Sequence, residues 1–115
     1  MSWDEIVAFA LTLPDAERGT YYGGPAVKVA RNGRAFLSPE REAAVSFCLM
    51  IDLDTIEMLK ETDPETWYQP PHYLNWPAVL VRYDSADPER VRAMIALARD
   101  QAAAKKPAAA RKKTA

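Results

Sequence analysis

The sequence predicts a single domain that mixes helices with β-strands, and three observations lead to this fold class. The chain has 115 residues, of which 49% are hydrophobic and 27% charged, proportions that suit one compact core. Three stretches with apolar residues at helical spacing follow residues that can cap a helix. The dipeptide Asn32-Gly33 separates two apolar runs and predicts a β-hairpin. Together these features indicate α and β elements built around one core.

Local capping signals locate the predicted helices. The three candidate N-caps are Ser2, Asp52 and Asp87. Glu5 completes a capping box with the first cap, and the apolar spacing after it predicts a helix over residues 3–12. The second helix is expected to end before Asp63-Pro64. Pro88 occupies the first helical position of the last helix, which we expect to close the core.

Strands are predicted between these helices. Residues 16–22 end in β-favouring side chains and precede a Gly-Gly-Pro break, so we expect a short strand there. Residues 43–51 form a mostly apolar run that suits a strand in the centre of a sheet. Residues 78–83 read as another strand, and the segment 67–76 before it is expected to form a hairpin-like excursion.

The predicted hairpin has a type I′ turn, because Asn-Gly tolerates the positive φ angles that such a turn needs. With a two-residue loop, Arg31 faces Arg34, and Leu37 points away from the core face. That core face would hold Val27, Val29 and Phe36. Two opposed arginines repel each other, so they are either solvated turn charges or a site for an anionic partner near the tip.

The net charge of −1 conceals an uneven distribution. Residues 101–115 carry five basic groups and no acid, so residues 1–100 carry 10 basic and 16 acidic groups, a net charge of −6. The basic residues of this C-terminal stretch are Lys105, Lys106, Arg111, Lys112 and Lys113. We therefore expect a folded domain over residues 1–101 and a disordered tail of low complexity over residues 102–115.

The composition also bears on compartment and cofactors. No run approaches the roughly 18 to 20 apolar residues that span a bilayer, and the N-terminus lacks the basic and apolar regions of a signal peptide. Cys48 is the single cysteine and His72 the single histidine, so neither an internal disulfide nor a Cys/His zinc cluster can form. We expect a soluble, cytoplasmic protein with no metal, no cofactor and no membrane partner.

Few residues of the sequence suggest a catalytic role. His72 lies in a Pro-Pro-His-Tyr segment, where it is expected to fix a turn, and Cys48 lies in an apolar strand without a basic neighbour in sequence. No pair of carboxylates stands out as acid and base, and neither a GxGxxG nor a GxxxxGK[ST] motif occurs. The sequence therefore predicts a protein that is not an enzyme.

The aromatic segment 67–76 admits two interpretations. Trp and Tyr present flat faces with a polar edge, so His72, Tyr73 and Trp76 could line a pocket for a small ligand or a protein partner. The segment 67–76 could instead form a satellite core under a loop. Sequence alone leaves both open.

Several motifs, in this order and spacing, resemble the MmcQ/YjbR family of small bacterial proteins over roughly residues 3–100. They are Leu13-Pro14, Gly24-Pro25-Ala26-Val27-Lys28-Val29, Asn32-Gly33-Arg34-Ala35-Phe36, the apolar strand ending in Leu49, Pro71-His72-Tyr73, Trp76 and Val79-Leu80-Val81-Arg82. The resemblance implies an α+β fold with helices packed against an antiparallel β-sheet, similar to the double wing of a phage transcription factor. It also implies DNA binding, with residues 28–34 as one wing and residues 72–82 as the other.

The leading functional hypothesis is thus a DNA-binding protein that contacts phosphates and reads little sequence. The candidate DNA-binding residues are Lys28, Arg31, Arg34, Arg82, Lys105, Lys106, Arg111, Lys112 and Lys113. The acidic body argues against duplex binding unless the basic groups gather on one face. The alternatives are a binding module that uses the aromatic segment and an enzyme centred on His72.

Overall fold

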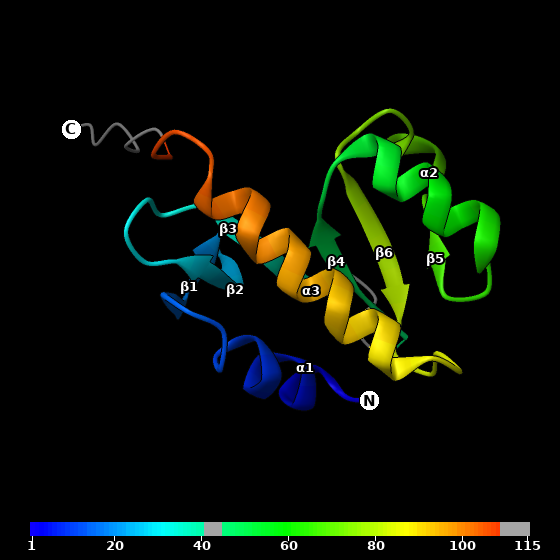
Figure 1. The fold of residues 1–115 in the computed structure, drawn as a ribbon, viewed down its shortest axis with the longest axis horizontal. Coiled ribbons are helices and arrows are strands. Elements are labelled where there is room, and N and C mark those ends of the chain that lie inside the picture. Colours follow the sequence, from blue (N-terminus) through cyan, green and yellow to red (C-terminus); the bar gives the residue numbers. More distant parts are fainter. Residues whose placement is uncertain (41–44, 109–115) are drawn as a thin grey trace.

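The computed structural model describes residues 1–40 and 45–108, which form a six-stranded sheet and three α-helices (Figure 1). In chain order the elements are α1 (Trp3–Ala10), β1 (Ala16–Tyr21), β2 (Gly24–Val29), β3 (Ala35–Pro39), β4 (Ser46–Met50), α2 (Leu53–Thr62), β5 (Trp67–Tyr68), the 3₁₀ turn η1 (Pro71–Tyr73), β6 (Ala78–Arg82) and α3 (Pro88–Ala103). The predicted α+β class is confirmed.

The strand order is β1-β2-β3-β4-β6-β5, and every neighbouring pair is antiparallel. β4 lies between β3 and β6, as its apolar run predicts. β4 is shorter than the predicted strand over residues 43–51, since residues 45 and 51 lie outside β4, and residues 43 and 44 lie outside the described part of the chain.

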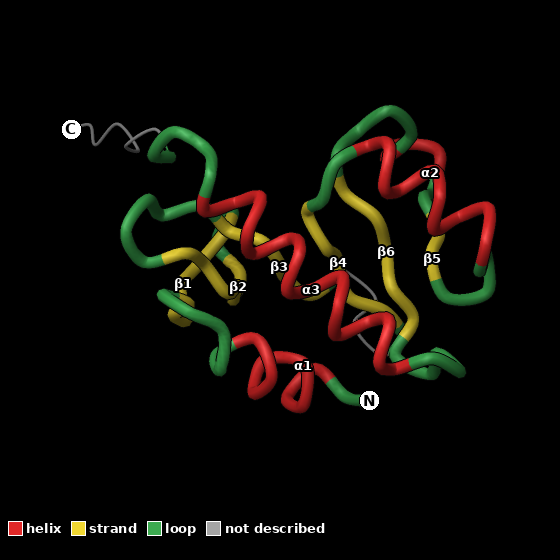
Figure 2. The backbone as a smooth tube through the Cα atoms, viewed as in Figure 1, coloured by secondary structure: helices red, strands yellow, loops and turns green. Residues whose placement is uncertain are grey.

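The helices pack on one face of the sheet and leave the other face open. α3 crosses β2, β3 and β4, α2 lies on β5 and β6, and α1 packs beside α3 (Figures 1 and 2). Side chains from all three helices and from the sheet share one core, for example Ile6, Phe47, Ile56 and Ile95. On the opposite face a smaller apolar cluster of Cys48, Ala78 and Leu80 is partly covered by Tyr73.

All three predicted caps are confirmed. The Ser2 hydroxyl accepts from the Glu5 amide at 3.2 Å while the Glu5 carboxylate accepts from the Ser2 amide at 2.8 Å. Asp52 and Asp87 accept from backbone amides three residues further on. The first helix ends at Ala10, two residues before the predicted end. No helix in the described part combines the length and apolar character needed to cross a bilayer.

The predicted two-residue turn at Asn32-Gly33 is wrong. The two-residue turn lies instead at Tyr22-Gly23, where both φ angles are positive (52° and 81°) and Tyr21 pairs with Gly24. Asn32 belongs to a five-residue connection, residues 30–34, between β2 and β3. Its side chain makes long-range hydrogen bonds that a local turn rule does not consider.

The expected orientation of Leu37 is also wrong. Val27 pairs with Leu37 while Lys28 pairs with Ala35, so β3 contains one extra residue, Phe36, at this point. Such a β-bulge turns two consecutive side chains to one face. Phe36 and Leu37 are consequently both buried in the helix-covered core.

The end of the fold lies beyond the boundary predicted at residue 101. α3 continues to Ala103, and Ala102 is buried. The Ala108 amide donates to the Asn32 carbonyl at 2.8 Å, which ties the segment after the helix to the 30–34 loop. Residues 102–108 thus differ from the expected disorder, whereas residues 109–115 lie outside the described part.

Candidate functional site

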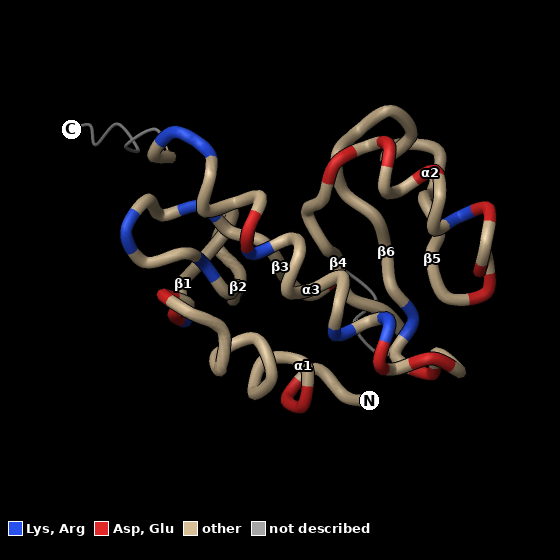
Figure 3. The backbone as a smooth tube through the Cα atoms, viewed as in Figure 1, with Lys and Arg blue, Asp and Glu red and all other residues tan. Residues whose placement is uncertain are grey.

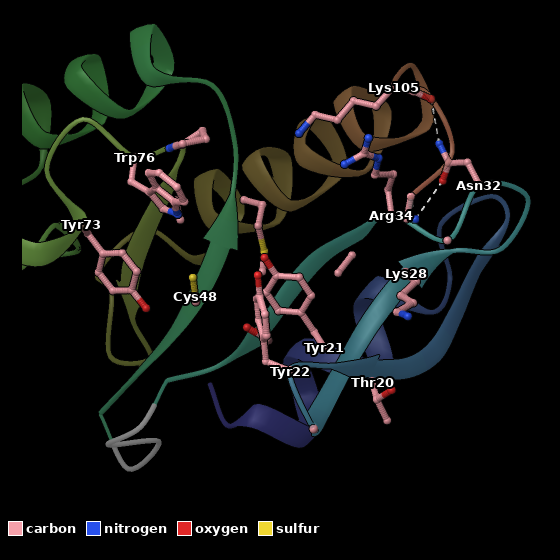
Figure 4. Close-up of a pocket in the computed structure, with 18 residues that line it drawn as sticks. Thr20, Tyr21, Tyr22, Lys28, Asn32, Arg34, Cys48, Tyr73, Trp76 and Lys105 are labelled. Atoms are coloured by element: carbon pink, nitrogen blue, oxygen red, sulfur yellow. Dashed lines mark hydrogen bonds between the residues drawn. The ribbon is translucent and has the colours of Figure 1, made fainter. Parts of the chain in front are cut away.

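The open face of the sheet carries a concave pocket of about 880 Å³ (Figure 4). The turn between β1 and β2, the 30–34 loop, strands β3 and β4, the segment before β6 and the end of α3 all contribute to its lining. Its basic residues are Lys28, Arg34 and Lys105, and its aromatic residues are Tyr21, Tyr22, Tyr73 and Trp76. We refer to this site as the open-face pocket.

The charged side chains that line the pocket in the described part of the chain are all basic. Lys28 lies opposite Glu17 in the register of β1 and β2. Its aliphatic stem runs over Gly19, where an added Cβ would lie only 2.8 Å from the Lys28 Cδ atom. A glycine at this position of β1 therefore leaves the space that the lysine side chain occupies.

Asn32 positions the other two basic residues. Its Oδ1 atom accepts from the Arg34 amide at 3.0 Å, and its Nδ2 atom donates to the carbonyls of Ala102 (2.8 Å) and Lys105 (3.2 Å). The Arg34 guanidinium donates through Nε to the Lys106 carbonyl at 2.7 Å. Because the last carbonyls of a helix are unpaired and carry partial negative charge, a donor-rich loop is well suited to cap α3. The cap brings Arg34 and Lys105 to the same side of the pocket (Figure 4).

Two of the aromatic side chains are unusually exposed, since 89% of Tyr22 and 62% of Trp76 is accessible to solvent. The Tyr22 ring contacts the ring of Tyr21 edge-on, with 4.6 Å between centroids. Tyr22 has a φ of 52°, a conformation that bulky side chains rarely adopt and that costs free energy. Burial of the Tyr22 ring does not offset that cost, because the ring lies in solvent.

Gln69 holds the backbone that carries Trp76. Its Nε2 atom donates to the carbonyls of Tyr73 (3.1 Å), Trp76 (3.0 Å) and Ala78 (2.8 Å). Its Oε1 atom accepts from Lys60 at 2.9 Å, which links this segment to α2. Each interpretation of the aromatic segment, core or pocket lining, holds for part of it. Trp67 is buried in the core, whereas Tyr73 and Trp76 line the pocket.

The pocket includes a neutral group, Cys48. Burial raises the pKa of its thiol to about 12, and the nearby Glu40 carboxylate adds to the shift. Burial also raises the pKa of Tyr73, with further contributions from Cys48 and Glu40, and the Tyr73 hydroxyl donates to Glu40 at 3.3 Å. Both groups are protonated near neutral pH, so neither supplies a nucleophile there.

Charge is unevenly divided over the molecule (Figure 3). Acidic residues are concentrated on α2 and the turn after it, while basic residues form one group around the 30–34 loop and the end of α3 and another at the end of β6 and the start of α3. The basic end coincides with the open-face pocket. The arrangement favours an anionic ligand there and disfavours one near α2.

The structure brings together five of the residues predicted from sequence. Those lining the pocket are Lys28, Arg34, Lys105, Tyr73 and Trp76. His72 is not among the lining residues and packs against the ring of Tyr73, with 4.7 Å between centroids. Arg82 lies over the Tyr68 ring, 4.7 Å from its centroid, in a separate hollow that contains Asp63, Glu65 and Asp84.

The remaining predicted residues lie at the edge of the site or outside the described part. Arg31 is exposed on the loop, and its guanidinium lies 3.5 Å from the Ala103 carbonyl. Lys106 contributes its carbonyl to Arg34. Arg111, Lys112 and Lys113 lie outside the described residues. Sequence reasoning missed Tyr21, Tyr22 and Asn32, although the Tyr-Tyr-Gly-Gly run is itself a turn signal.

Within residues 1–40 and 45–108, no three His, Cys, Asp or Glu side chains lie close enough together to hold a metal ion. Comparisons with family models, with curated proteins and with solved structures find no match for this chain.

Proposed function

We propose that the protein is a non-enzymatic nucleic-acid-binding protein that holds phosphates in the open-face pocket. One observation carries the proposal. Lys28 and Arg34 of the β2–β3 hairpin and Lys105 of the segment after α3 line one concave face. Phosphate contacts by Lys and Arg supply most of the affinity of such proteins without reading sequence.

The resemblance to the MmcQ/YjbR family supports DNA as the ligand. The two predicted wings contribute Lys28 and Arg34 on one side and Tyr73 and Trp76 on the other, and all four line the same pocket. The acidic character of the body does not oppose this role, because the charged lining of the pocket in the described part is basic. Three basic residues on this face meet the condition that basic groups gather together, which supports the proposal against the sequence-based objection.

The C-terminal stretch would extend the same site. Ala108 lines the pocket, and Arg111, Lys112 and Lys113 follow it by three to five positions in the sequence. They could contact further phosphates of the same strand.

The test is a salt series with labelled DNA oligonucleotides, single-stranded and duplex, followed by fluorescence anisotropy. Lys28→Gln combined with Lys105→Gln removes two phosphate contacts and should lower the magnitude of the slope of log K against log salt by about 1.4 for single strands or about 1.8 for duplex. The matched control is Arg18→Gln with Arg92→Gln, one exposed and one half-buried cation, neither of which is part of the pocket lining.

An equal change of slope in the pocket variant and in the control would refute a phosphate site in the pocket. Absence of binding by the wild-type chain at low salt would refute nucleic-acid binding altogether. The tail is tested in the full chain with Arg111→Gln, Lys112→Gln and Lys113→Gln, because a truncation at residue 101 would also remove Ala102 and Lys105, whose carbonyls bind Asn32.

A second candidate is a small anionic ligand with an aromatic part. The volume of about 880 Å³ lies within the range of small-molecule sites, roughly 300–1,000 Å³. A thermal-shift screen of mononucleotides and other aromatic anions tests it. This function requires a compound that raises the melting temperature of the wild type but not that of Trp76→Ala.

A further inference from the structure

Two exposed aromatic rings lie at separate parts of the pocket rim. Tyr22 belongs to the turn between β1 and β2, and Trp76 precedes β6, so the rings come from strands that are not neighbours in the sheet order (Figure 4). Lys28, Arg34 and Lys105 line the same pocket. Aromatic rings beside a basic groove form the combination that binds single-stranded nucleic acid.

Both rings are carried by backbone with a defined conformation. Tyr22 and Gly23 form a type I′ turn, and the Gln69 amide binds the Trp76 carbonyl at 3.0 Å. Asn75, directly before Trp76, also has a positive φ of 66°. Strained backbone of this kind persists where the surrounding structure holds it and is concentrated at ligand sites.

We infer that the open-face pocket prefers single-stranded nucleic acid to duplex and that Tyr22 and Trp76 stack on its bases. This inference rests on the proposed function. In a duplex the base faces are covered by neighbouring base pairs, and a protein reaches only base edges, sugars and phosphates. Unpaired bases offer their faces to aromatic side chains, so the exposed rings add affinity for a single strand only.

The experiment measures the affinities of the full chain for labelled oligothymidylate and for a duplex of matched length. Tyr22→Asn removes one ring and suits the left-handed turn, and Trp76→Leu removes the other. Each should weaken single-strand binding by about 5- to 150-fold and leave duplex binding nearly unchanged. The salt slope should stay at the wild-type value, because no phosphate contact is lost.

Tyr22→Phe and Trp76→Phe keep an aromatic face and should retain most of the affinity. Leu74→Ala is the matched control, since Leu74 is exposed near Trp76 but does not line the pocket. Trp76 is far more exposed than Trp67, so oligothymidylate should quench the wild-type fluorescence, and Trp76→Phe should abolish most of that quenching. Melting temperatures show whether each variant is folded.

The possible results separate the two proposals. The stacking inference is overturned if the duplex binds as tightly as the single strand, or if both ring-removing variants bind oligothymidylate with wild-type affinity. In either case the proposed function is still tested by the Lys28→Gln, Lys105→Gln variant. Absence of binding to either DNA form at low salt overturns the proposed function and the inference together.

Discussion

At the scale of single residues, Cys48 illustrates how burial determines chemistry. The residue is 5% exposed, and burial together with Glu40 raises the pKa of its thiol from an ordinary 9.0 to about 12. The folded state therefore favours the neutral thiol. This stabilising contribution is fully present below pH 9.0 and is lost as the pH rises toward about 12.

We predict that the free energy of unfolding falls above pH 9 and that Cys48→Ala makes this fall shallower. Burial also raises the pKa values of Tyr73 and Tyr83, so part of the alkaline loss should remain in the variant. Urea denaturation across the alkaline range measures both slopes. Identical pH dependence in the wild type and in Cys48→Ala would contradict the assignment.

Residue type predicted much of the pocket lining, whereas the rest of the lining depends on backbone conformation. Lys28, Arg34 and Lys105 could be named from sequence because cations suit phosphates, and Trp76 because a flat polar-edged ring suits a pocket. Tyr22 could not, because it lies in the pocket lining through a left-handed φ that sequence rules assign to Gly or Asn.

At the scale of secondary-structure elements, Asp52 joins two helices. It caps α2 by accepting from the Thr55 amide at 2.9 Å, and it accepts from Gln101 of α3 at 2.6 Å. Burial opposes ionisation of this carboxyl, but the hydrogen bonds from Thr55 and Gln101 outweigh burial and lower its pKa below the ordinary 3.8. The resulting stability is present above pH 3.8 and is lost as the pH falls through the lowered pKa.

We predict that Asp52→Ala lowers the free energy of unfolding at neutral pH by about 1–2 kcal/mol, because it removes an N-cap. Asp52→Asn is the matched control, since asparagine caps helices nearly as well but carries no charge. Urea denaturation should therefore show a smaller loss for Asp52→Asn. A loss as large as that of Asp52→Ala would mean that the charge, and not the cap, carries the effect.

Helix boundaries were predictable because capping is local, whereas the long loop was not. Ser2, Asp52 and Asp87 each bond to amides three residues away, within reach of a sequence rule. Asn32 instead bonds to Ala102 and Lys105, about 70 positions further along the chain. The same side chain that predicts a turn is used to cap α3, and the five-residue loop follows from that contact.

At the scale of the whole molecule, the acidic and basic residues that sum to a net charge of −1 are separated in space as well as in sequence. The α2 end is acidic, and the pocket end is basic (Figure 3). Lys105 and Lys106, which sequence assigned to a tail, lie in a segment hydrogen-bonded to the 30–34 loop. For Lys105 and Lys106, the contrast between acidic body and basic tail is therefore a contrast between two ends of one fold.

The most direct test of a nucleic-acid site on the open face is an NMR titration of the labelled protein with oligothymidylate. We predict that the shifted amides belong to Tyr22, Lys28, Arg34 and Lys105, together with the Trp76 indole, and that α1 and α2 change little. Shifts confined to residues after Ala108 or to the helix-covered face, or no shifts at low salt, would contradict the account.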